Sequence, residues 1–222
     1  MHLTPDSGTE RTTTVVIGAG LSGLAVASEL SRHGVGSIVV DSLMGTPSPA
    51  TASLHTGMLP RCDVSDPAAM QERNEILRHL RNYAASHHLD VRSTTRAVRL
   101  DFLGSEPQPA YGQVADLGST RTGLSPVETR KWAVHTPDGI LLADHIVVTR
   151  CAQSQLRRML ADLGISIGQN LVAAMRAVGM HLVGVGELVT PTPKEVLRQA
   201  KAVGQAISAR VALPASPGVA LA

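Results

Sequence analysis

Short apolar runs and longer amphipathic stretches alternate along this chain. β-Branched runs predict buried strands near residues 14–18, 37–41, 145–149 and 181–185. Apolar residues spaced three or four apart predict helices directly after the first strand and over 67–88, 153–163 and 193–211. Because strands that alternate with helices form parallel sheets covered on both faces, we predict a three-layer α/β fold with a mostly parallel sheet.

The middle of the chain departs from this alternation. Residues 91–102 have the alternating, β-branched pattern of a strand, and the short strands 132–134 and 140–142 flank a turn at 136–139. These segments predict a small antiparallel β appendage over 91–142, interrupted by a loop at 104–130 that is rich in Gly, Pro and Ser. We expect residues 1–11 to be a mobile leader, 12–212 to be a single domain and 213–222 to be a frayed tail.

The first strand runs into a glycine-rich turn with the sequence Gly18-x-Gly20-x-x-Gly23. Gly18 permits the tight strand-to-helix turn, Gly20 lets the backbone approach a pyrophosphate, and Gly23 lets the helix pack closely on the strand. The unpaired N–H groups and the positive dipole end of the helix start can bind a diphosphate without a cationic side chain. We therefore predict a Rossmann-like FAD/NAD(P)-binding domain. The predicted cofactor contacts in this turn are Gly18, Ala19, Gly20, Ser22 and Gly23.

The second strand ends in Asp41. A carboxylate at this position is placed to accept hydrogen bonds from both hydroxyls of an adenosine ribose. It would also repel a 2′-phosphate, so NADP is the dinucleotide least favoured at this site. The fingerprint itself does not choose between FAD and NAD, and a glycine-rich turn in an unrelated α/β domain is the alternative interpretation.

Charge and composition narrow the classes of function. The chain has 222 residues, a formal net charge of +2 and only four aromatic residues, so neither nucleic-acid nor anionic-membrane binding is favoured. No apolar run approaches the roughly twenty residues of a membrane span, and the N-terminus lacks a signal pattern, so we expect a cytoplasmic protein. Cys62 and Cys151 are far apart in the sequence, and no residue spacing typical of a metal site is present.

Four segments, in the same order, resemble flavin-containing monooxygenase-like FAD oxidoreductases. They are the fingerprint region at 18–41, EILRHLRNYAASHHLDVRSTTRAVRLD at 75–101, WAVHTPDG at 132–139, and GMHLVGVGE at 179–187 with the helix that follows it. The second segment is the more distinctive one, because it lies outside the fingerprint that all dinucleotide folds share. All four segments match the FAD-binding half of that family.

The resemblance implies that FAD is the cofactor, with NAD less favoured. Gly18, Gly20 and Gly23 would contact the FAD pyrophosphate, and Asp41 would contact the adenosine ribose. Gly186 and Glu187 match a late Gly-Asp segment that approaches the ribityl chain. This sequence has Asp41 where the family usually has Glu, and Glu187 where it has Asp.

A larger departure from the family follows the strand at 145–149. The family closes this strand with an Ala-Thr-Gly turn, whereas this chain continues with Thr149, Arg150 and Cys151. No second G-x-G-x-x-G occurs in the 222 residues. The chain therefore resembles the flavin half of such an enzyme without the half that binds the nicotinamide reductant.

Three functions fit these patterns. The first is a monooxygenase-like, FAD-dependent oxidoreductase that acts on a small organic molecule, with electrons from a separate reductase, from free NAD(P)H or from its substrate. The second is a module that binds a dinucleotide without turnover. The third is a cofactor-free scaffold derived from a flavoprotein, with its cleft used for another reaction or a partner. No catalytic side chain can be assigned. An exposed sheet edge would favour a homo-oligomer or another partner chain.

Overall fold

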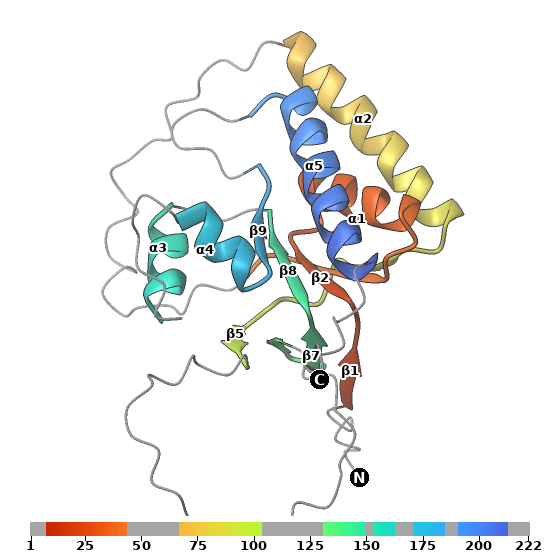
Figure 1. The fold of residues 1–222 in the computed structure, drawn as a ribbon. Helices are drawn as coiled ribbons and strands as arrows, with labels where there is room; N and C mark the ends of the chain where they lie inside the picture. The colour runs from red at the N-terminus through yellow and green to blue at the C-terminus, as the bar shows by residue number, and fades with distance from the viewer. Residues whose placement is uncertain are drawn as a thin grey trace, which may run out of the picture.

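The computed structural model describes residues 8–43, 67–103, 131–149, 153–162, 171–184 and 191–212. Its larger sheet has five parallel strands in the order β4-β3-β2-β8-β9, of which β2, β8 and β9 are labelled in Figure 1. These strands are β2 (Thr14–Ile17), β3 (Ser37–Val40), β4 (Asp90–Arg92), β8 (His145–Val148) and β9 (Met180–Leu182). The four strands predicted for a parallel sheet are therefore confirmed, and β4 adds a fifth at one edge.

The smaller sheet has four strands in the order β1-β7-β6-β5. They are β1 (Gly8–Arg11), β5 (Arg99–Phe102), β6 (Trp132–Thr136) and β7 (Gly139–Ala143). β6 and β7 form the predicted hairpin, in which Thr136 pairs with Gly139 and the Thr136 hydroxyl donates to the Gly139 carbonyl over 2.9 Å. β5 pairs antiparallel with β6, whereas β1 pairs parallel with β7.

The prediction of one strand over 91–102 is wrong. β4 pairs in parallel with β3, whereas β5 belongs to the smaller sheet, so the antiparallel part of the predicted appendage begins at Arg99. A turn separates the two strands, and in it the Thr95 N–H donates to the Arg92 carbonyl over 3.1 Å. The alternating, β-branched pattern runs through the sequence of both strands. The pattern alone therefore did not show where the chain leaves the larger sheet and enters the smaller one.

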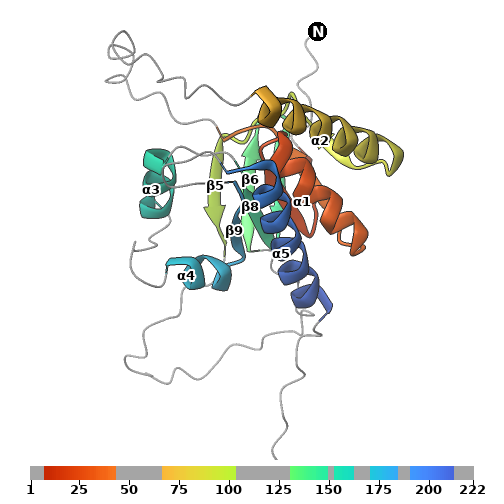
Figure 2. The same ribbon diagram turned by 90° about the horizontal axis from the view of Figure 1, so that it is seen from above.

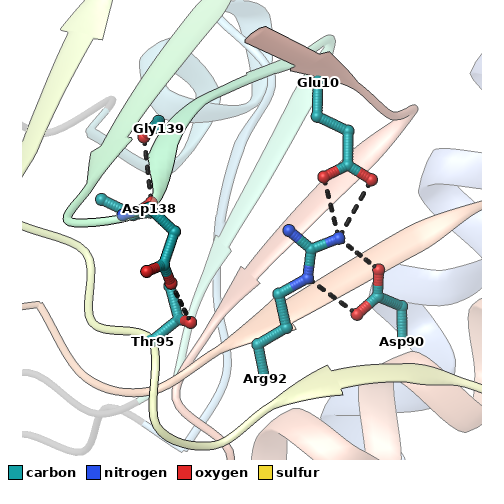
Figure 3. Close-up of polar contacts among 7 residues, drawn as sticks. Glu10, Asp90, Arg92, Thr95, Asp138 and Gly139 are labelled. Atoms are coloured by element: carbon teal, nitrogen blue, oxygen red, sulfur yellow. Dashed lines mark hydrogen bonds and ion pairs between the residues drawn. The ribbon is translucent and has the colours of Figure 1, made fainter. Parts of the chain in front are cut away.

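The prediction of a mobile leader over 1–11 is wrong for its last four residues, which form β1. Glu10 on β1 pairs with Arg92 on β4, whose Nη2 lies 2.8 Å from Glu10 Oε2 and 2.6 Å from Asp90 Oδ2 (Figure 3). Backbone pairing with β7 and this ion-pair network hold a segment that is polar and aperiodic in sequence. Neither contact is visible without knowing which strands are neighbours.

Helices cover both faces of the parallel sheet (Figures 1 and 2). α1 (Leu21–Arg32), α2 (Pro67–Ser86) and α5 (Pro193–Ala212) lie on one side, and α3 (Gln153–Asp162) and α4 (Leu171–Ala177) lie on the other. The helices predicted at 67–88, 153–163 and 193–211 are therefore present, and α4 is a helix that the sequence pattern did not predict. None of the described helices is both long and apolar enough to span a membrane.

Each parallel strand divides its side chains between two cores because successive residues point to opposite faces. Val16, Val39 and Val147 belong to the core beneath α1 and α5. On the opposite face, Val15, Ile17, Ile146 and Val148 belong to a core shared with the smaller sheet, α3 and α4, and Trp132 is fully buried there. Because both faces of the sheet are packed against a core, the ends of its strands are held in fixed positions.

Candidate functional site

The carboxyl ends of β2, β3 and β8 meet at one edge of the parallel sheet. Gly18 directly follows β2, Asp41 directly follows β3, and Thr149 directly follows β8. The structure therefore brings the predicted residues of 18–23 and Asp41 to the edge where open α/β sheets bind ligands. The other predicted cofactor contacts, Gly186 and Glu187, lie outside the described residues, as do Arg150 and Cys151 of the departure from the family turn.

The three fingerprint glycines meet different local demands. Gly18 has a φ of 117°, in the region that disfavours side chains, and its N–H donates to the Val40 carbonyl over 2.8 Å. An ideal Cβ on Gly23 would lie 1.7 Å from the Gly18 carbonyl oxygen, so only glycine allows α1 to approach the turn so closely. A Cβ on Gly20 would meet nothing within 4 Å, so that side of the turn is open.

The start of α1 is suited to an anion. Gly20 is its N-cap residue, makes no side-chain capping bond, and is followed by no acidic residue in the first turn. The N–H groups of this turn therefore have no capping side chain, and the helix dipole adds positive potential. Together with the open space at Gly20, these features are compatible with the diphosphate that the fingerprint predicts.

The Ser22 side chain faces the turn that follows β9. Its hydroxyl oxygen lies 2.5 Å from the position that a Cβ on Gly184 would take, and Gly184 has a φ of 69°. The Gly184 N–H donates to Gln199 Oε1 on α5 over 2.9 Å. Gln199 therefore holds the chain just before residues 185–190, which include Gly186 and Glu187, and Ser22 leaves no room for a side chain at Gly184.

Thr149 ties β8 to the fingerprint turn. It is 4% exposed, and its hydroxyl donates to the Ile17 carbonyl over 2.9 Å and lies 3.3 Å from the Gly18 carbonyl. Its N–H donates to the same Ile17 carbonyl over 3.0 Å. In the sequence, Thr149 was noted only as the first of three residues that stand where the family has an Ala-Thr-Gly turn. Its position directly after a buried strand was the signal that could have identified it.

Asp41 has a partner that the sequence did not predict. Arg96 Nε lies 3.2 Å from Asp41 Oδ2, and the two side chains are 57% and 33% exposed. These residues are 55 positions apart and meet because β4 lies beside β3. An ion pair this exposed contributes about 0–1 kcal/mol, so ribose hydroxyls could replace Arg96 at the carboxylate at little cost.

A recess of about 350 Å³ lies beside the fingerprint turn. α1, α2 and β4 form its walls, which are mostly apolar, and Ala19 is the fingerprint residue among them. The residues that line the recess are Ala19, Leu24, Arg81, Ala84, Ala85, Leu89, Val91 and Ser93. Its volume is within the range of small-molecule sites in proteins.

A family of known proteins matches most of this region. The family described as FAD binding domain matches residues 11–162, which include the fingerprint turn, Asp41 and Thr149. The chain belongs to the FAD-binding domain family. The predicted resemblance to FAD oxidoreductases is therefore confirmed for an FAD-binding domain over these residues. No curated protein matches the sequence.

Three solved structures are similar to part of this chain. The bacillithiol disulfide reductase Bdr of Staphylococcus aureus is 14% identical, with a TM-score of 0.36 over 64% of this chain and 39% of that one. A flavin-containing monooxygenase of Stenotrophomonas maltophilia is 22% identical, with a TM-score of 0.34 over 63% and 38%. Cyclohexanone monooxygenase is 19% identical, with a TM-score of 0.35 over 64% and 26%. The chain therefore spans less than two fifths of the length of each of these structures.

Replacing Asp41 with asparagine should weaken FAD binding about tenfold, since one charged hydrogen-bond acceptor is lost at the ribose position. Stability should change little, because the ion pair with Arg96 is exposed. The matched control is Asp101→Asn on β5, which also breaks contacts with an arginine and a histidine, Arg99 and His135. Fluorescence titration of FAD measures both variants, and equal affinities for wild type and Asp41→Asn would show that Asp41 does not contact the ribose.

Proposed function

We propose that this chain binds FAD and acts as a monooxygenase-like, FAD-dependent oxidoreductase on a small organic molecule. The observation that carries the proposal is that the FAD-binding domain family matches the residues that form the open, uncapped helix start at Gly20. A helix start of this kind binds diphosphate, and FAD contains one. NAD contains one as well, but the family match favours FAD.

The side chains and backbone of the chain would hold the cofactor and orient it. The N–H groups near Gly20 would bind the pyrophosphate, and the Asp41 carboxylate would accept hydrogen bonds from the ribose hydroxyls. Thr149 keeps the turn in place through its two hydrogen bonds to the Ile17 carbonyl at the end of β2. Gly186 and Glu187 would approach the ribityl chain. FAD supplies the redox chemistry when it is bound, and the protein supplies position and electrostatics.

The electron source of the proposed enzyme is a separate reductase or the substrate itself. The 222 residues contain one G-x-G-x-x-G, which the FAD pyrophosphate would occupy. Among these residues, NADPH would then have no second fingerprint of this kind from which to present its hydride, and the advantage of fixed proximity would be lost. We place this activity in the cytoplasm, with a reductase or a second copy of the chain as the protein partner.

Stopped-flow reduction of the FAD-loaded protein tests this account of the electron source. Bleaching of the flavin absorbance by NADPH alone should be slow, and its rate should rise linearly with NADPH concentration without saturation. Rapid, saturable bleaching would show that a nicotinamide site exists and would contradict the need for a separate electron source. Failure of the folded protein to take up FAD would contradict the proposed function as a whole.

A further inference from the structure

Arg96 is held in a fixed position beside the end of β3. The Asp41 N–H donates to the Thr95 carbonyl over 2.8 Å, and Leu43 and Ala97 form a parallel β-bridge. The Thr95 hydroxyl donates to Asp138 Oδ2 over 2.6 Å, which ties this segment to the turn of the β6–β7 hairpin (Figure 3). Thr95 is 7% exposed. Residues 95–97 therefore run alongside 41–43, and the backbone of Arg96 is fixed on both sides.

The ion pair changes the charge that a ribose would meet at this edge. A lone carboxylate repels a 2′-phosphate, but the guanidinium of Arg96 lies within 3.2 Å of the Asp41 carboxylate and offsets its charge. Within the described residues, the contact with Asp41 uses Nε, and the side chain is 57% exposed. A guanidinium presents a planar fork of N–H donors that matches the geometry of a phosphate. The site therefore contains both an acceptor for ribose hydroxyls and a donor for a phosphate.

We propose that Arg96 is a specificity-determining residue and that this site also accepts 2′-phosphorylated adenine dinucleotides, the class that contains NADP. The inference rests on the proposed function, because the same helix start would bind the pyrophosphate of either ligand. It reverses the expectation from the sequence that Asp41 makes NADP the dinucleotide least favoured at this site. A 2′-phosphorylated dinucleotide would then compete with FAD for this site.

Displacement of FAD from the full-length protein by two matched compounds tests the proposal. ADP-ribose and 2′-phospho-ADP-ribose differ only in the 2′-phosphate, so the ratio of their inhibition constants isolates the contribution of that group. In the wild type, 2′-phospho-ADP-ribose should bind no more than tenfold more weakly than ADP-ribose. In Arg96→Gln, this ratio should rise at least another tenfold, because the phosphate would then meet only the Asp41 carboxylate.

Two further variants separate this role from a general effect of charge or folding. Arg96→Lys retains the positive charge but not the planar fork of donors, so its ratio should lie between those of the wild type and Arg96→Gln. Arg99→Gln removes another exposed arginine, which pairs with Asp101 on β5, and it should leave the ratio unchanged. The effect of Arg96→Gln should shrink between 0.05 M and 1 M salt, because the screening length falls from more than 10 Å to about 3 Å.

The possible results distinguish this inference from the proposed function. If FAD does not bind the wild type, the proposed function is wrong. If FAD binds but the wild-type ratio exceeds tenfold, or if Arg96→Gln leaves the ratio unchanged, the role of Arg96 is overturned while FAD binding stands. If neither compound displaces FAD at millimolar concentration, the inference is also overturned, because adenosine and pyrophosphate would not be the groups that the site holds.

Discussion

Replacing Gly23 with alanine should lower the free energy of unfolding by at least about 3 kcal/mol. The new methyl group would lie 1.7 Å from the Gly18 carbonyl oxygen, which belongs to the backbone and cannot rotate away. Overpacking of a core typically costs about 1–3 kcal/mol, and contact with fixed backbone is the severe case. This cost exceeds the roughly 1 kcal/mol by which alanine favours a helix over glycine. Urea denaturation of the purified variant measures the difference.

Gly20→Ala is the matched control for this substitution. Nothing lies within 4 Å of a Cβ at Gly20, so the variant should lose no more than about 1 kcal/mol of stability, the usual cost of a poorer N-cap. FAD affinity should nevertheless fall tenfold or more, because the methyl group would occupy the side of the turn that the pyrophosphate approaches. If Gly20→Ala destabilises the fold as much as Gly23→Ala, the glycines do not have the separate roles assigned to them.

Acidification from pH 7 to pH 5 should destabilise the domain by about 2 kcal/mol for each of two buried histidines. His145 on β8 and His181 on β9 are 5% and 4% exposed, and their ring centroids lie 5.8 Å apart. Burial lowers the pKa of each to about 4, and His145 further lowers the pKa of His181. Arg210, Arg176 and Lys131 add repulsion in this region, whereas Asp144 opposes the shift of His145.

Because the pKa of each histidine is lower in the folded chain than in the unfolded chain, the free energy of unfolding falls as the solution becomes more acidic. The unfolded chain binds protons at the two histidines near pH 6.5, whereas the folded chain resists protonation until about pH 4. The free energy of unfolding is therefore fully retained above pH 6.5, where both histidines are neutral in either state. It falls as the pH drops from 6.5 toward 4, because the unfolded chain then binds protons that the folded chain does not. Melting temperatures from pH 7 to pH 5 measure it. In the double variant His145→Gln, His181→Gln, the dependence on pH should be markedly flatter, and an unchanged dependence would contradict this assignment.

The sequence predicted the parts of the site that are local in the chain. Gly18, Gly20 and Gly23 lie within one strand-to-helix turn, so their spacing was enough to predict the backbone conformation and the close packing of that turn. Asp41 follows the next strand, and its placement at the same edge needed only the parallel arrangement of β2 and β3. These features depend on the period of apolar residues and on turn chemistry, both of which the sequence displays directly.

The parts that the sequence did not predict depend on which strands are neighbours. Arg96 reaches Asp41 only because β4 joins the parallel sheet beside β3, and Glu10 reaches Arg92 only because β1 lies next to β7. The alternating pattern of 91–102 is the same whether the segment forms one strand or two. Thr149 could not be predicted from the family motif. The motif shows only that the Ala-Thr-Gly turn is absent at this position, whereas the role of Thr149 lies in the hydrogen bond from its hydroxyl to the Ile17 carbonyl.

Calorimetric titration of FAD into the purified, full-length protein tests the central claim most directly. We expect saturable binding of one FAD per chain with micromolar or tighter affinity. At a hundredfold excess over the dissociation constant, FAD should stabilise the fold by about 2.7 kcal/mol and raise the melting temperature accordingly. Gly20→Ala should bind at least tenfold more weakly while melting close to wild type without ligand. A folded protein that releases no heat with FAD, and whose melting temperature does not rise, would contradict the account and favour a cofactor-free scaffold.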